Sequence, residues 1–289
     1  MVHNGLMVID MHTHSNISDG TDTPAQLVSA AAASGIAVVA LCDHDTMDGV
    51  AAAQAAGADT GVTVVRGIEM STQLGDDTVH LLAYGCDPGN EALAQALADV
   101  REGRQQRVPR MVAALRAAGV PITVEDVMAQ AASCSTLGRP HVADALVALG
   151  VVSDRREAFD VWLNHGRPGY VGHLRIDLDR GTSLVHQAGG VCVLAHAWGR
   201  GTRSVLTPGV IAWLAEDAGL DGLEVDHNDH LRQERTMLRA LAAANDLIVT
   251  GGSDYHGTGK VNHALGCHST SQRSYQAIMA LIAERGGCP

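Results

Sequence analysis

Histidine and carboxylate side chains recur in this sequence at or just after short apolar runs. The first pair, His12 and His14, follows the apolar residues 6–9. Divalent transition ions prefer imidazole and carboxylate ligands, and residues two apart on an extended strand point to the same side. Nine side chains are therefore candidate metal ligands: His12, His14, Asp19, His44, Glu69, His80, His196, Asp254 and His256. Nine ligands are too many for one ion with open positions, so bridging carboxylates would let them serve two or three divalent ions.

A structural interpretation competes with this one. A single histidine at a strand end is more often a hydrogen-bonded core or surface residue than a ligand, and His186, His263 and His268 are interpreted in that way. Asp10 and Asp43 stand beside the candidate ligands and are expected either to orient them or to act as turn acceptors. Ligand-type residues at six successive strand ends favour a metal cluster, because each buried charge would otherwise be costly.

Such a cluster predicts hydrolysis of phosphate esters. A hydroxide that bridges two ions is a nucleophile at neutral pH, because metal binding lowers the pKa of water from about 15.7 to about 7. It would attack phosphorus in line while the ions hold the other phosphoryl oxygens. His230 is the candidate that assists the leaving oxygen, and a structural role at the start of a helix is the alternative.

The elements that must position these residues alternate between strands and helices at both ends of the chain. Apolar runs predict strands at residues 6–11, 37–42, 63–68, 78–84, 191–195, 222–225 and 247–250. If these strands are parallel neighbours, their C-terminal ends converge and bring the nine ligands together. Residues 91–175 show helical patterns only. The sequence thus predicts an α/β fold with a barrel-like core, residues 1–90 and 176–289, interrupted by a helical insertion, residues 91–175, that covers the substrate.

Charge and aromatic residues suggest where a substrate would bind. The chain carries a net charge of −12, which argues against a broad surface for long duplex nucleic acid. Residues 95–175 differ, with ten arginines and eight acidic residues. Arg139 and His141 are predicted to bind a phosphate, although Gly138-Arg139-Pro140 would also suit an exposed turn. Trp198 and Tyr255 are predicted to contact a nucleobase or, alternatively, to pack at the rim of the barrel.

The composition indicates a cytoplasmic protein that does not enter a membrane. No run approaches the roughly 20 apolar residues needed to cross a bilayer, and the first residues lack a basic signal region. The six cysteines show no C-x-x-C spacing, and Cys42 and Cys192 lie in apolar runs where a reduced cysteine behaves as a small hydrophobe.

The ordered set of motifs resembles the PHP (polymerase and histidinol phosphatase) family over almost the whole chain. The motifs that carry the resemblance are Asp10-Met11-His12-Thr13-His14-Ser15, Ser18-Asp19-Gly20, Asp43-His44-Asp45-Thr46, Gly67-Ile68-Glu69, His80-Leu81-Leu82, Ala195-His196 and Gly252-Ser253-Asp254-Tyr255-His256-Gly257. The resemblance implies a distorted (β/α)7 barrel that holds two or three ions of manganese, iron, zinc or magnesium. It also implies a ligand set for each ion: His12, His14, Glu69 and Asp254 for the first, Glu69, His80 and His196 for the second, and Asp19, His44 and His256 for the third.

Within this family, the insertion around residues 138–143 and 166–171 is similar to one subgroup. That subgroup includes phosphatases of 3′,5′-nucleotide bisphosphates and 5′→3′ nucleases that release mononucleotides from short RNA. The resemblance therefore implies a metal-dependent phosphoesterase whose substrate is a nucleotide or a short oligonucleotide.

Three other functions remain open from the sequence. A phosphatase of histidinol phosphate or another small molecule would use the same metals. An amidohydrolase also begins with a His-x-His motif, but it typically bridges its metals with a mid-barrel lysine, and the single lysine here, Lys260, lies after the last strand. A regulatory protein with structural metals is the third alternative.

Overall fold

The computed structural model describes residues 7–130, 138–172 and 174–289. The chain divides into two compact units. The first comprises Met1–Leu97 and Arg175–Pro289, and the second comprises Ala98–Leu174. The prediction that residues 91–175 form an inserted domain covering the substrate stays a prediction.

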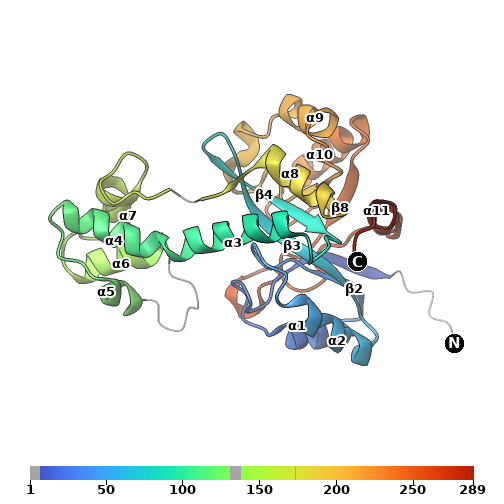
Figure 1. Ribbon diagram of the computed structural model, residues 1–289, viewed down its shortest axis with the longest axis horizontal. Helices are drawn as coiled ribbons and strands as arrows, with labels where there is room; N and C mark the ends of the chain where they lie inside the picture. The colour runs from blue at the N-terminus through green and yellow to red at the C-terminus, as the bar shows by residue number, and fades with distance from the viewer. Residues whose placement is uncertain (1–6, 131–137, 173) are drawn as a thin grey trace. The chain divides into compact units, whose positions relative to one another are not determined.

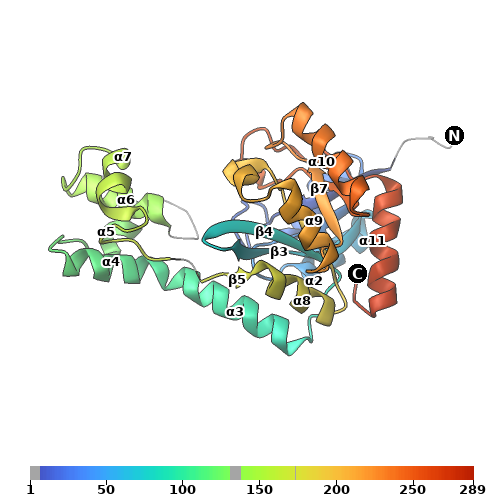
Figure 2. The same cartoon turned by 90° about the horizontal axis from the view of Figure 1, so that it is seen from above.

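The first unit is an α/β fold with a central, mostly parallel sheet (Figures 1 and 2). In sheet order the strands are β1 (Val8–Thr13), β2 (Ile36–Leu41), β3 (Thr63–Leu74), β4 (Asp77–Tyr84), β6 (Val191–Leu194), β7 (Gly222–Asp226) and β8 (Ile248–Gly251), and β5 (Ile176–Asp177) pairs with β3 outside this path. Each of the seven runs predicted from the apolar pattern overlaps one of the strands on this path, and among the described residues only the two-residue β5 was missed.

The two ends of this path are joined by backbone hydrogen bonds. The amide of Asp254, just after β8, donates to the carbonyl of His12 at 2.8 Å, and the amide of His14 donates to the carbonyl of Tyr255 at 2.8 Å. Residues that follow the last strand are thereby held against the end of the first strand. The distorted seven-stranded barrel itself stays a prediction.

Strand β4 runs in the direction opposite to the one expected. It is antiparallel to both β3 and β6, whereas the other pairs are parallel. The connection from β3 to β4 is only Gly75-Asp76, and two residues can close a hairpin but cannot form the long crossover that parallel strands require. The reversal explains why His80 lies near the start of its strand, where it still reaches the end of the sheet at which the parallel strands finish. Glu69 likewise lies within β3 rather than after it.

Helices surround the strands of the first unit (Figures 1 and 2). They are α1 (Pro24–Ala33), α2 (Val50–Thr60), α8 (Leu178–Gln187), α9 (Pro208–Glu216), α10 (Arg232–Ala244) and α11 (Gln272–Arg285). Helix α1 begins at Pro24, because Thr23 and Gln26 form a capping box and Pro24 occupies the first turn. An aliphatic core formed by side chains of the strands and by Ile278 and Ile282 of α11 buries residues such as Val38 and Leu82, each contributing about 1.5–3 kcal/mol.

The second unit is helical. Helix α3 (Glu91–Gln105) extends into it and is followed by α4 (Arg107–Ala117), α5 (Val124–Met128), α6 (Arg139–Ala148), α7 (Arg155–Ala158) and the π-helical turn η1 (Phe159–Leu163). Its own core contains Met111, Leu115, Leu146 and Leu163. Helices α3 and α4 are separated only by Gln106. Among the described residues, no helix has the length and apolar character needed to cross a membrane.

Candidate metal centre

All nine predicted ligands lie in the first unit, at the end of the sheet where the parallel strands finish. Within each of three groups, one potential ligand atom per residue lies within 4.8 Å of the others: His12, His14, Glu69 and Asp254; His14, Asp19, His44 and His256; and His44, Glu69 and His80. The first group coincides with the set that the family resemblance implies for one ion. Which residues bind which ion stays a prediction.

Glu69 stands at the centre of the cluster. Its side chain is 1% exposed, and both of its oxygens face imidazoles. Oε1 lies 2.6 Å from His80 Nδ1 and 3.0 Å from His196 Nε2. Oε2 lies 3.0 Å from His14 Nε2, 3.2 Å from His12 Nε2 and 3.4 Å from His44 Nδ1. A carboxylate with five imidazoles around its two oxygens has the geometry of a bridge between ions.

In the ligand cluster, burial and neighbouring charges shift the pKa values of the side chains in opposite directions. Burial lowers the pKa of His12 and His14, but the neighbouring carboxylates outweigh it, raising the pKa of His12 well above its usual value and that of His14 to about 9. Burial would raise the pKa of Glu69, yet the surrounding histidines hold it well below its ordinary range. At His44, burial prevails and lowers the pKa to about 3. The carboxylates of the site are therefore ionised, and protonated histidines or bound cations would balance their charge.

Buried polar atoms without hydrogen-bond partners indicate whether divalent ions fit the ligand cluster. Among the described residues, His14 Nδ1, His44 Nδ1 and Asp254 Oδ1 are buried without a hydrogen-bond partner. Buried polar groups are normally bonded, so three orphan atoms in one cluster require an explanation. All three are of types that bind divalent ions, and each belongs to one of the ligand groups above. The residues present therefore fit divalent metal ions.

Asp19 closes the cluster on its outer side. It reaches back from the loop after β1, as expected, and its Oδ1 lies 3.2 Å from His256 Nε2 while its Oδ2 lies 3.6 Å from His44 Nε2. Its side chain is 45% exposed. A hollow of about 460 Å³ lies at this edge of the cluster, and its lining includes Asp19, His44, His256, Arg200 and Lys260. This edge of the cluster is thus accessible from solvent.

Two positioning residues were missed from the sequence. Glu224, in β7, accepts hydrogen bonds from His12 Nδ1 at 3.0 Å and from the amide of His196 at 2.7 Å. His227 lies just after β7 and places Nε2 3.2 Å from Asp254 Oδ2. The sequence signal for Glu224 and His227 is the one that identified the predicted ligands: an acidic residue and a histidine flank the end of an apolar run.

Arg200 and Lys260 were also missed as members of the site. Arg200 Nη2 donates to Asp254 Oδ2 at 3.0 Å, and Lys260 Nζ donates to the same oxygen. Asp254 thus has one oxygen held by cations while the other, Oδ1, faces the ligand histidines. Arg200 has a φ of 56°, and Asp254 and His196 also have positive φ values, 52° and 28°. Backbone strain of this kind in residues other than glycine concentrates at functional sites.

Asp10 and Asp43 orient the segments that carry the ligands. Asp10 accepts from the backbone amides of His12 at 3.3 Å and Ser253 at 2.9 Å, so it joins the end of β1 to the segment after β8. Asp43 accepts from the amide of Ser15 at 2.8 Å and from its hydroxyl at 2.6 Å. Three further histidines are hydrogen-bonded as interpreted: His186 to Asp221, His263 to the carbonyl of Ser253 and His268 to Asn228.

The geometry of His230 favours its structural alternative. The ring is buried, Nδ1 donates to the carbonyl of Val225 at 2.9 Å, and Nε2 accepts from the amide of Trp198 at 3.1 Å. This arrangement requires the neutral tautomer with its proton on Nδ1, and that proton is already donated to backbone. The catalytic role of His230 stays a prediction that this geometry does not support.

The geometry of Trp198 and Tyr255 favours the alternative in which these side chains pack within the fold. Trp198 is 5% exposed, its indole N–H donates to the carbonyl of Leu206 at 2.8 Å, and the guanidinium of Arg203 lies 4.8 Å from the ring centre. Tyr255 donates its hydroxyl to Asp22 at 2.6 Å and packs against core side chains. Contact with a nucleobase stays untested for both residues.

Arg139 and His141 belong to the second unit. His141 accepts at Nδ1 from the amide of Gly138 at 3.0 Å and thereby caps the start of α6. The guanidinium of Arg139 lies 5.8 Å from the ring centre of Phe159. Both side chains are partly exposed. Their predicted binding of phosphate stays a prediction.

The chain is similar to known proteins of one family. The PHP domain matches residues 10–116. A 3′,5′-nucleoside bisphosphate phosphatase from Chromobacterium violaceum is 36% identical over 260 residues, which cover 89% of this chain and 90% of the relative. A 5′-3′ exoribonuclease from Haemophilus influenzae is 31% identical over 252 residues, covering 86% of this chain and 89% of the relative. A solved structure described as a metal-dependent phosphoesterase from Bifidobacterium adolescentis matches with a TM-score of 0.75 and 38% identity, over 96% of this chain and 97% of that one.

Proposed function

The chain belongs to the PHP family and is a metal-dependent phosphoesterase, and from this premise we propose that it hydrolyses phosphate monoesters of nucleotides. The proposed substrates are 3′,5′-nucleoside bisphosphates, nucleoside monophosphates and the 5′ ends of short RNA. The observation that carries the proposal is Glu69, a buried carboxylate with five imidazoles around it, beside a hollow that Arg200 and Lys260 also line.

The residues of the cluster would hold two or three divalent ions, through the nine ligands predicted from the sequence. When bound, such ions activate water and neutralise charge on phosphoryl oxygens. Glu224 and Asp10 keep the strand ends in place, so the imidazoles are already oriented before a ligand arrives.

Arg200 and Lys260 supply the positive charge that an anionic substrate needs. The chain has a net charge of −12, and its single lysine stands at the edge of this cluster. A phosphate monoester carries about two negative charges near neutral pH. We assign the two cations to attracting and orienting its phosphoryl oxygens, because guanidinium and ammonium groups donate hydrogen bonds to phosphate.

The names of the two curated relatives support a nucleotide as the alcohol part. One acts on nucleoside bisphosphates and the other on the 5′ ends of RNA. Arg139 and His141 are proposed to bind a further phosphate of such a substrate. The acidic surface argues against long duplex nucleic acid.

A panel of phosphate esters tests this proposal. Purified protein supplied with manganese would be assayed for phosphate release from nucleoside 3′,5′-bisphosphates, nucleoside monophosphates, 5′-phosphorylated short RNA, histidinol phosphate and glycerol phosphate. We expect kcat/KM to be at least tenfold higher for a nucleotide than for histidinol phosphate. A preference for histidinol phosphate or glycerol phosphate would contradict the nucleotide assignment and leave the phosphoesterase class intact.

A further inference from the structure

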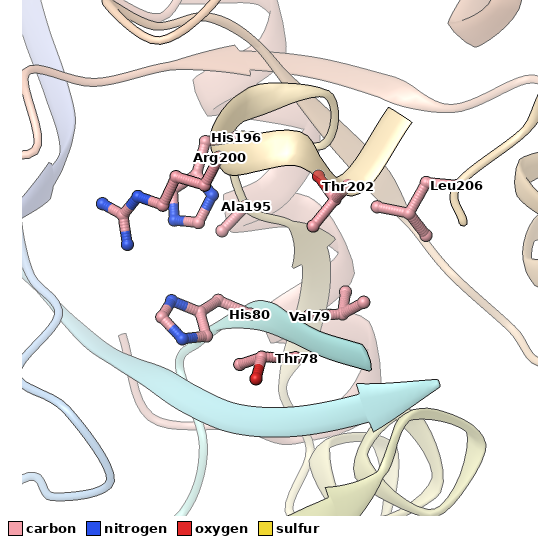
Figure 3. A pocket seen from close by; sticks show the side chains of 8 residues that line it. All are labelled: Thr78, Val79, His80, Ala195, His196, Arg200, Thr202 and Leu206. Atoms are coloured by element: carbon pink, nitrogen blue, oxygen red, sulfur yellow. The ribbon is translucent and has the colours of Figure 1, made fainter. Parts of the chain in front are cut away.

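A second, smaller hollow adjoins the metal centre within the first unit. Its volume is about 170 Å³. One wall is the start of β4, and the other is the segment from Ala195 to Leu206 that follows β6 (Figure 3). The lining residues are Thr78, Val79, His80, Ala195, His196, Arg200, Thr202 and Leu206.

This pocket is contiguous with the ligand cluster. His80 and His196 come from opposite walls, with ring centres 5.3 Å apart, and each also contacts Oε1 of Glu69 (Figure 3). A phosphoryl group at Glu69 would therefore have the pocket directly beside it. The group esterified to that phosphate must extend away from the cluster. The pocket that His80 and His196 bound is one space into which it can extend.

Arg200 lines both this pocket and the larger hollow over the ligands. Its backbone is left-handed, with a φ of 56° and a ψ of 24°, and its Nη2 contacts Asp254 at 3.0 Å. A strained conformation persists only where the surroundings enforce it. The side chain is thereby held at the junction of the two hollows, where it can donate to the phosphoryl oxygens of an ester that occupies both.

The lining of the pocket fits an uncharged sugar. Val79, Ala195 and Leu206 supply an apolar surface, and Thr78 and Thr202 supply hydroxyl oxygens. The hydroxyl oxygen of Thr202 lies 2.7 Å from the carbonyl oxygens of both Ala197 and Gly199, and its one proton is donated to this pair, so its oxygen remains an acceptor. A pentose has apolar C–H faces and hydroxyl donors in the same ring. The volume is well below the roughly 300–1,000 Å³ of pockets that hold a drug-sized ligand, so it accommodates one ring rather than a whole nucleoside.

We infer that this pocket is the subsite for the sugar ring next to the scissile phosphate, so that the enzyme selects pentose phosphates. The inference rests on the proposed function and narrows it. The described lining of the pocket contains neither Trp198 nor Tyr255, so it gives a base no indole or phenol ring to stack on. The described lining of the pocket contains no acidic side chain to pair with a cationic chain such as that of histidinol, and it includes the cationic Arg200.

Binding to variants of Thr78 tests the inference. Thr78 is exposed on the β4 wall of the pocket (Figure 3), and a phenylalanine there would fill the space. The probes are methylphosphonate and the phosphonate analogue of ribose 5-phosphate, in which a methylene group replaces the ester oxygen and prevents hydrolysis. Calorimetry on the manganese-loaded protein gives the Kd of each. We expect Thr78→Phe to weaken the ribose phosphonate at least tenfold more than it weakens methylphosphonate, and Thr78→Leu to give a smaller effect in the same direction.

The matched control is Asp77→Phe, because Asp77 is exposed at the start of the same strand and is not among the residues that line the pocket. It adds the same ring outside the pocket and should change the ratio of the two Kd values less than threefold. Thermal melting of all variants confirms that they fold. Equal weakening of both phosphonates by Thr78→Phe, or no weakening, would overturn the sugar subsite. Failure of the wild-type protein to hydrolyse any nucleotide would instead overturn the proposed function, and the binding ratios would still report on the pocket.

Discussion

Glu224 accepts a hydrogen bond from His12 at 3.0 Å, although the two residues are 212 positions apart in the chain. The bond engages Nδ1 of the imidazole, so Nε2 points to Glu69, 3.2 Å away. The other oxygen of Glu224 accepts from the amide of His196 at 2.7 Å. One buried carboxylate thus orients two of the predicted ligands from different strands.

The first prediction concerns Glu224→Gln. The amide has one acceptor oxygen in place of two, so either His12 or the segment of His196 loses its partner. We expect metal affinity to fall about 10- to 100-fold, as is typical when the partner of a ligand histidine is removed. Competition with a metal-binding dye measures this. Glu216→Gln, the same change at an exposed position of α9, should leave the affinity within twofold of wild type. Equal affinities in both variants would show that Glu224 does not orient the ligands.

Arg139→Ala tests whether the helical insertion contributes to substrate binding. If Arg139 binds a second phosphate, its removal should raise KM for a nucleoside 3′,5′-bisphosphate about tenfold or more, and KM for p-nitrophenyl phosphate far less. The control is Arg156→Ala in the same unit, because that arginine is 91% exposed and forms an ion pair with Asp160, four residues along the chain. Steady-state kinetics with both esters measure the two KM values. Equal increases in the two KM values would remove Arg139 from substrate recognition.

An ion pair remote from the metal centre gives a pH prediction. Arg285 Nη2 lies 2.7 Å from Asp221 Oδ1, and His186 Nε2 lies 3.0 Å from Asp221 Oδ2. Burial raises the pKa of Asp221, but Arg285 and His186 outweigh it and hold the pKa well below its ordinary value. A carboxyl group with a depressed folded pKa stabilises the protein above its unfolded pKa of about 3.9, and this contribution is lost as pH falls through the folded pKa.

Arg285→Met should therefore reduce the free energy of unfolding by about 1–3 kcal/mol at pH 7, and the deficit should shrink below about pH 4. Urea unfolding at a series of pH values measures both quantities. Arg273→Met, an exposed position of the same helix, provides the control for loss of a positive charge. A deficit that stays constant from pH 7 to pH 3 would show that Asp221 is not the partner responsible.

The apolar pattern located the strands because buried strands must be apolar whatever their neighbours are. It carries no information on strand direction, and so β4 was expected to run parallel. The local signal for a hairpin was present in Gly75-Asp76, where Gly75 adopts a φ of 61°. His80 lies at the metal centre despite this error, because it is near the start of its strand and the reversal brings that end of the strand to the metal centre.

Contacts between distant segments explain what the sequence did not predict. Arg200 and Lys260 have ordinary sequence contexts, and their roles depend on bonds to Asp254. Conversely, His230 looked catalytic because it follows a strand end, yet the fold places backbone groups against both of its nitrogens. The predicted ligands were easier to find because histidine and carboxylate side chains are costly to bury without cations.

Metal content tests the central claim most directly. Wild-type protein would be passed through gel filtration to remove loose ions and then analysed by inductively coupled plasma mass spectrometry alongside Glu69→Gln. A cluster built around Glu69 predicts at least two equivalents of divalent metal per wild-type chain, and at least one equivalent fewer in the variant. A wild-type preparation that releases phosphate with less than one equivalent bound, or a Glu69→Gln variant that retains the full complement, would contradict it.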